Sequence, residues 1–196
     1  WRRWLRFHIM ILGLQHIDSQ RIAAIDSNGA ELRYADITLL SQHITSLIPT
    51  RSLCFLLVEN NVGGIAWVMS MLDSRQLVPL IINVKTEDTL HQQLLSTYQP
   101  AYICAPNHFA VQGEVVDSQY EYTLTKVSYS TPALHSELSH LLPTSGSTGS
   151  PKLVRHKYDN IEAAGLNIST FFELKETDRP LMILPLYYTM GLSMVF

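Results

Sequence analysis

Three segments that are apolar throughout constrain the fold of this chain more than any other feature. They are Leu53–Val58, Leu77–Ile82 and Ala101–Ala105. Between the first two, Val62–Ser74 repeats apolar residues at helical spacing, and a further helix is expected to begin at Thr86 or Asp88. Strands that are apolar throughout must be covered on both faces. The pattern therefore predicts an α/β fold with a mostly parallel sheet flanked by helices.

Shorter elements are predicted before this alternation. Arg21–Asp26 and Glu31–Tyr34 have the composition of strands, and Asn28-Gly29 between them is a two-residue hairpin signal because both positions tolerate a positive φ. Asp36 is then expected to cap a helix whose apolar residues recur with a period of 3.6.

The second half of the chain is less regular. Val111–Pro132 is more polar, and its alternation predicts a half-exposed strand. Asp159 and Glu162 have the spacing of a capping box, which predicts a helix that ends at about Phe172. Leu181–Leu184 is predicted to be another buried strand.

Bulk properties exclude several classes of protein. A hydrophobic content of 46% and a charged content of 16% indicate a globular body rather than a disordered segment. A net charge of −3 provides no basic field for nucleic acid, and the 8 histidines lack metal-ligand spacing. Cys54 and Cys104 lie in apolar segments, which favours buried free thiols and a cytoplasmic protein. The alternative is a disulfide between them, which would require the two strands to be neighbours.

The ends of the sequence suggest a piece of a longer protein. The chain of 196 residues begins with Trp1 and stops at Phe196 within an apolar run. Trp1–Leu14 has helical spacing and several arginines, so it is either a helix that docks on the body, which we favour, or a basic helix at a membrane surface. We therefore treat residues 1–20 as an N-terminal extension and residues 21–196 as one partial domain, truncated at its C-terminus.

A run of small and hydroxyl residues is the strongest functional signal. It consists of Thr144, Ser145, Gly146, Ser147, Thr148, Gly149, Ser150, Pro151 and Lys152. Glycines let backbone amides approach a ligand, hydroxyls donate hydrogen bonds, and one lysine supplies a cation, so the run suits a phosphate chain. A surface linker would have similar composition, but its apolar flanks and terminal Pro-Lys favour a binding loop.

The spacing excludes one common phosphate loop. A Walker loop needs G-x-x-x-x-G-K-[ST] and opens directly into a helix, whereas this run has G-x-x-G-x-x-K. Pro151 favours an extended residue before it, and the segment after Lys152 resembles a strand. We therefore expect an exposed loop that joins two strands. An unrelated phosphate-loop kinase would instead require a helix starting at Lys152.

The order T-S-G-S-T-G-S-P-K resembles the signature loop of the AMP-forming adenylating enzymes, which include acyl-CoA synthetases, luciferases and peptide-synthetase adenylation domains. The resemblance extends from about Arg21 to Phe196 and implies the N-terminal part of the large domain of such an enzyme. It implies that Thr144–Gly149 and Lys152 hold the β- and γ-phosphates of ATP, with Lys152 as the catalytic cation and Mg²⁺ sharing the charge. No protein ligand to the metal is predicted.

A second segment carries the same resemblance. Pro185–Leu192 is similar to the family's P-L-[FY]-H-x-x-G-L segment, which implies that Tyr188 and Gly191 line the acid pocket. Tyr188 stands where the family has histidine, and a tyrosine cannot be a cation near neutral pH. This difference leaves the acid substrate open.

The resemblance implies an acid–thiol ligase. Such an enzyme converts a carboxylic acid into an acyl-adenylate and passes it to coenzyme A or to the phosphopantetheine arm of a carrier protein. The family's later Y-G-x-T-E and T-G-D segments and its C-terminal lysine do not occur in these 196 residues. We therefore expect the chain alone to be inactive. The alternative is a noncatalytic nucleotide- or partner-binding remnant of the same fold.

Overall fold

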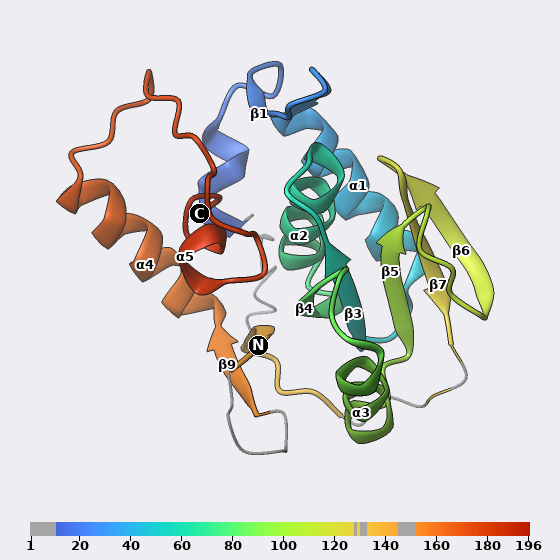
Figure 1. The fold of residues 1–196 in the computed structure, drawn as a ribbon. Helices are drawn as coiled ribbons and strands as arrows, with labels where there is room; N and C mark the ends of the chain where they lie inside the picture. The colour runs from blue at the N-terminus through green and yellow to red at the C-terminus, as the bar shows by residue number, and fades with distance from the viewer. Residues whose placement is uncertain (1–10, 128, 130–132, 145–151) are drawn as a thin grey trace, which may run out of the picture.

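The computed structural model describes residues 11–127, 129, 133–144 and 152–196. These residues form a seven-stranded sheet with helices on both faces and a separate two-stranded sheet (Figure 1). The larger sheet has the order β6-β7-β5-β3-β4-β8-β9. Its strands are β3 (Ser52–Val58), β4 (Leu77–Asn83), β5 (Tyr102–Pro106), β6 (Glu114–Gln119), β7 (Tyr122–Lys126), β8 (Leu138–Pro143) and β9 (Leu153–Lys157).

The centre of the sheet is parallel and its edges are antiparallel. Strands β5, β3, β4 and β8 run in the same direction, as predicted for the buried segments. Strand β7 is antiparallel to β5, and the two edge strands, β6 and β9, are antiparallel to β7 and β8. The β6–β7 hairpin replaces the single half-exposed strand predicted for this region. Its turn places Tyr120 and Glu121 at positive φ without a glycine, so the usual hairpin signal is missing.

Alternation along β3 divides the core into two clusters. Cys54, Leu56 and Val58 join the cluster under α1 (Tyr34–Leu47) and α2 (Val62–Ser74). Residues at alternate positions of β3 join the cluster that contains Leu94 of α3 (Asp88–Tyr98). Because successive side chains of a strand point to opposite faces, one strand contributes to both clusters. Cys54 and Cys104 are buried free thiols, and burial raises the pKa of both.

The small sheet pairs β1 (Ile22–Ile25) with β2 (Glu31–Arg33) in an antiparallel hairpin. Its connection runs from Asp26 to Ala30, which is wider than the predicted two-residue turn, because the Asp26 carboxylate accepts two backbone N–H groups inside it. Asp36 was expected at the cap of α1. It is instead the third residue of the helix, and its Oδ2 accepts the backbone N–H of Arg33 at 2.7 Å.

The N-terminal segment packs on the body from Ile11 onward. A short, kinked 3-10 helix, η1 (Ile11–His16), buries Ile11 and Leu14 in the first cluster, as the docking interpretation expects. The Ile11 N–H donates to the Asp73 carboxylate at 3.1 Å. Residues 1–10, the remainder of the predicted helix, lie outside the described residues. No helix in the described part of the chain has the length and apolar character needed to cross a membrane.

Two predictions near the C-terminal end are wrong in detail. Lys157 occupies the N-cap position of helix α4 (Tyr158–Phe171) without a side-chain capping bond, and Asp159 lies in the first turn of the helix. Leu181–Leu184 is not a buried strand, since Leu181 is 79% exposed and Ile183 is 78% exposed. This segment belongs to a long excursion between α4 and the short helix α5 (Thr189–Leu192), which Figure 1 shows extending away from the sheet. An apolar run becomes a strand only where a neighbouring strand is available to pair with it.

Candidate functional site

The parallel strands β3, β4 and β8 end on the same side of the large sheet, which we call its carboxyl edge. Val58, the last residue of β3, pairs with Asn83, the last residue of β4. Leu80 of β4 pairs with Leu141 of β8. Because the two strands are parallel, the same register places Asn83 opposite Thr144, three residues further along each chain segment. Open α/β sheets bind ligands at the carboxyl ends of their strands. This edge is therefore the candidate site, and the predicted phosphate loop starts on it.

The described residues show how the predicted phosphate loop is joined to the sheet. Thr144 N–H donates to the Lys152 carbonyl at 2.9 Å, and the Thr144 hydroxyl donates to the same oxygen at 3.2 Å. The loop therefore joins β8 to β9, as predicted, and no helix begins at Lys152. Both side chains are exposed. Residues 145–151, which include Ser145, Gly146, Ser147, Thr148 and Gly149, lie outside the described residues, and their phosphate-binding role stays a prediction.

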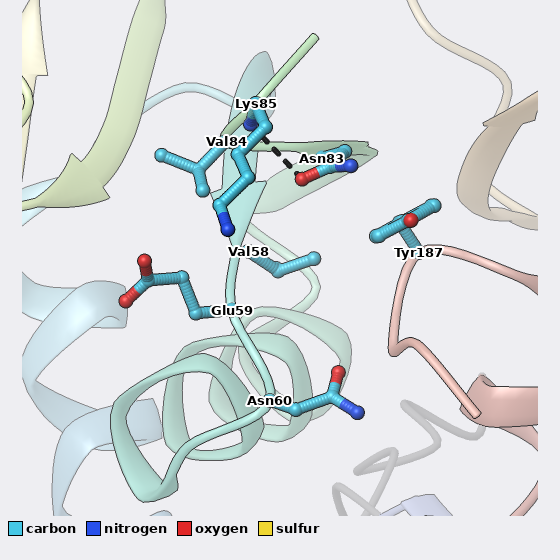
Figure 2. Close-up of a pocket in the computed structure, with 7 residues that line it drawn as sticks. All are labelled: Val58, Glu59, Asn60, Asn83, Val84, Lys85 and Tyr187. Atoms are coloured by element: carbon cyan, nitrogen blue, oxygen red, sulfur yellow. Dashed lines mark hydrogen bonds between the residues drawn. The ribbon is translucent and has the colours of Figure 1, made fainter. Parts of the chain in front are cut away.

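A cavity of about 260 Å³ opens at the carboxyl ends of β3 and β4. Its lining combines two apolar residues with five polar or charged ones: Val58, Glu59, Asn60, Asn83, Val84, Lys85 and Tyr187. Figure 2 shows the Asn60 and Asn83 side chains directed toward the side of the cavity where Tyr187 lies. Asn83 is held by its own loop, because its Oδ1 accepts the Lys85 N–H at 2.9 Å. The cavity can therefore present amide, phenol and ammonium groups to a polar ligand.

A second cavity of similar volume lies on the other side of Glu59. Its lining comprises Glu59, Asn61, Pro106, Asn107, His108 and Glu121. The Glu59 carboxylate points away from Tyr187 (Figure 2) and is held on this second side, at 3.5 Å from His108 Nε2 and 3.3 Å from the donor Asn61 Nδ2. Glu59 thus separates the two cavities, and its charge is directed toward the second.

A capped and closely packed turn supports the edge between the cavities. Asn61 caps α2 by accepting the Gly64 N–H at 2.8 Å. The buried Tyr122 hydroxyl accepts the Glu59 N–H at 3.0 Å and donates to Asn61 Oδ1 at 3.4 Å. A Cβ on Gly63 would lie 2.2 Å from the Tyr120 carbonyl oxygen, so only glycine permits this approach of α2 to the β6–β7 turn.

Of the segment predicted to line the acid pocket, Tyr187 lines the first cavity, whereas Tyr188 and Gly191 are not among its lining residues. Tyr188 is 55% exposed and precedes α5. Gly191 is buried, and a Cβ there would lie 2.0 Å from the Pro185 carbonyl oxygen, so the turn requires glycine at this position. The assignment of Tyr188 and Gly191 to the acid pocket therefore stays a prediction.

Four polar residues of the first cavity were not predicted from the sequence: Asn60, Asn83, Lys85 and Tyr187. Three of these lie at or just after the end of a buried strand, a position that could have identified them. Partial burial, followed by the neighbouring Tyr188, raises the pKa of Tyr187. Among the described residues, no three His, Cys, Asp or Glu side chains are grouped so that they could hold a metal ion. The donors at this edge suit a phosphate or carboxylate ligand better than a bare cation.

Comparison with known proteins identifies the fold. The chain resembles o-succinylbenzoate CoA synthetase (MenE) from Bacillus subtilis in complex with its acyl-adenylate intermediate, with 19% identity and a TM-score of 0.72 over 93% of this chain and 50% of that one. The same enzyme in complex with ATP and magnesium matches with 18% identity and a TM-score of 0.70, over 93% and 52% of the two chains. MatB from Rhodopseudomonas palustris matches with 16% identity and a TM-score of 0.68, over 91% and 40%.

The chain thus spans about half the length of the MenE structures and has the fold of the N-terminal part of an adenylate-forming enzyme. No curated protein sequence matches it. The family model for the AMP-binding enzyme matches residues 68–196, well over half of the chain and including the whole phosphate-loop motif. On this match and on its loop motif, the chain belongs to the AMP-binding enzymes, the AMP-forming adenylating family.

Proposed function

We propose that this chain supplies the triphosphate loop and part of the acid pocket of an ATP-dependent, AMP-forming acid–thiol ligase. In this reaction a carboxylate oxygen attacks the α-phosphorus of ATP, which gives an acyl-adenylate and releases pyrophosphate. A thiol then attacks the acyl carbon and displaces AMP. The observation that carries the proposal is the hydroxyl- and glycine-rich loop, whose stem joins β8 and β9 at the carboxyl edge of the parallel strands.

The chemistry of the loop fits a polyphosphate. Lys152 would neutralise charge on the leaving pyrophosphate, while hydroxyls and amides from Thr144 to Gly149 would fix its oxygens in place. Mg²⁺, when bound with ATP, would share the negative charge of the phosphates. Because Thr144 and Lys152 are tied through the Lys152 carbonyl, both ends of the loop keep a fixed spacing. Tyr188 and Gly191 are proposed to lie along the acid.

The acceptor is proposed to be a thiol on coenzyme A or on a carrier protein. The resemblance to a CoA synthetase supports this class, and structures of that enzyme hold ATP with magnesium, AMP or an acyl-adenylate. The two buried free thiols suit a reducing compartment, so we place the protein in the cytoplasm.

Pyrophosphate exchange tests the proposal. In the longer protein that contains this chain, ATP should exchange label with pyrophosphate when a suitable acid from a panel of fatty, aryl and amino acids is present. Lys152→Ala should slow this exchange about a hundredfold. Lys157→Ala is the matched control, because Lys157 is also exposed but lies at the opposite end of β9. Unchanged exchange in Lys152→Ala would remove Lys152 from its role.

The chain of 196 residues by itself should show no exchange with any acid. Phosphate contacts alone cannot orient the α-phosphorus against a carboxylate, and misplaced reactants lose most of the benefit of proximity. Robust exchange by this chain would contradict our account of which parts are essential. If the longer protein binds ATP but shows no pyrophosphate exchange with any acid, the noncatalytic nucleotide-binding alternative would be favoured.

A further inference from the structure

Asn60 forms a two-point clamp on a distant part of the backbone. Its Nδ2 donates to the Leu184 carbonyl oxygen at 3.0 Å, and its Oδ1 accepts the Leu186 N–H at 2.8 Å. The two partners flank Pro185, which has no N–H of its own. One side-chain amide thus pairs with both a backbone carbonyl and a backbone N–H of this turn, as a neighbouring strand would. The partners lie more than 120 residues away in the sequence.

The clamp acts where the excursion between α4 and α5 returns to the body. Upstream of it, Leu181 and Ile183 are largely exposed and contribute little burial. At the clamp Leu186 is completely buried, and it packs so closely on α2 that a Cβ on Gly64 would lie 3.3 Å from its Cδ2. Asn60 thus supplies the polar half of an anchor whose apolar half is Leu186.

The anchor also determines the shape of the first cavity. Tyr187 follows Leu186 directly, and Asn60 and Tyr187 line the same space at the carboxyl edge of the sheet (Figure 2). Just beyond, the Tyr188 N–H donates to the Pro185 carbonyl at 3.0 Å, so the turn that begins at the clamp continues into α5. A shift of this turn would move Tyr187 without moving the β8–β9 stem.

We infer that Asn60 is a positioning residue: by holding the backbone on both sides of Pro185, it keeps Tyr187 in the wall of the first cavity and so sets the affinity for the carboxylic acid. The inference rests on the proposed function for the identity of the ligand, but the clamp itself does not. Because the phosphate loop is attached through other strands, loss of the clamp should weaken binding of the acid much more than binding of ATP.

Hydrogen exchange of the 196-residue chain tests the clamp directly. In Asn60→Ala, the Leu186 amide should exchange about five- to tenfold faster than in the wild type, because its acceptor is lost. In Asn60→Asp, an acceptor remains but the donor to Leu184 is gone, so the rate should be intermediate. Asn28→Ala is the control, because Asn28 is an exposed asparagine in the β1–β2 loop. Equal rates for Leu186 in the wild type and Asn60→Ala would overturn the inference.

Kinetics of the longer protein test the consequence. Asn60→Ala should raise the KM for the acid about tenfold and leave the KM for ATP within about twofold of the wild type, with Asn28→Ala unchanged in both. Equal increases in both KM values would indicate general loosening of the fold and would overturn the positioning role. If the wild type shows no exchange with any acid, the proposed function fails, while the hydrogen-exchange comparison still decides the clamp.

Discussion

Low pH should destabilise this protein through a buried histidine in the β8–β9 hairpin, which carries the phosphate loop. His140 of β8 is 2% exposed, and its ring stacks on that of His156 of β9 with centroids 4.4 Å apart and planes 3° apart. The Ser139 hydroxyl donates to the His156 carbonyl at 2.9 Å and lies 3.1 Å from His140 Nδ1. A proton added to His140 would therefore be buried against another imidazole.

The magnitude follows from the difference in pKa between the folded and unfolded states. Burial, and then the nearby His156, lower the pKa of His140 from 6.5 to about 3. The neutral form is thus favoured in the folded protein, so its stabilising effect is complete above pH 6.5 and is lost progressively as the pH falls toward 3. When the pH falls from 7.5 to 5, His140 alone should lower the free energy of unfolding by about 2 kcal/mol. Burial lowers the pKa of His156 as well, which acts in the same direction.

Urea unfolding followed by fluorescence of the buried Trp67 provides the assay. The comparison is the slope of unfolding free energy against pH in the wild type and in His140→Phe, which keeps an aromatic ring but cannot be protonated. The wild type should lose about 2 kcal/mol more than the variant between pH 7.5 and pH 5. His16→Gln removes an exposed histidine and should keep the wild-type slope, because His140 is intact. Equal slopes in the wild type and His140→Phe would refute the reasoning.

Two further substitutions test the packing around the site. Gly191→Ala should lower the free energy of unfolding by about 3 kcal/mol, because the new Cβ would lie 2.0 Å from the Pro185 carbonyl oxygen; a loss below 0.5 kcal/mol, within the range of neutral surface changes, would contradict this. Tyr122→Phe should cost about 1–2 kcal/mol in chemical denaturation, because it leaves the Glu59 N–H unpaired. Tyr129→Phe, at a 42% exposed tyrosine, is its control, and equal stability of these two variants would show that the Tyr122 hydroxyl contributes nothing.

The sequence by itself determined the central alternation of strands and helices. Helix α2 matches the predicted Val62–Ser74, and β3, β4 and β5 agree with the predicted strands to within one residue at each end. These elements could be predicted because each is buried by a large apolar face, and burial leaves a periodic pattern in the residues themselves. The phosphate-loop motif likewise indicated both its family and its position between two strands, because glycine, hydroxyl and lysine at this spacing have few other uses.

Tertiary structure decided the features that depend on a distant partner. Leu181–Leu184 has the composition of a buried strand yet lies exposed, because in the described structure no strand pairs with it. Tyr187 lines the first cavity, and Asn60 bonds the backbone on both sides of Pro185, just before Tyr187 in the chain. A single side-chain amide that bonds backbone more than 120 residues away leaves no periodic pattern in the sequence. Local preference thus determines which segments become helices or strands, whereas the geometry of the site depends on contacts that form only when those elements pack.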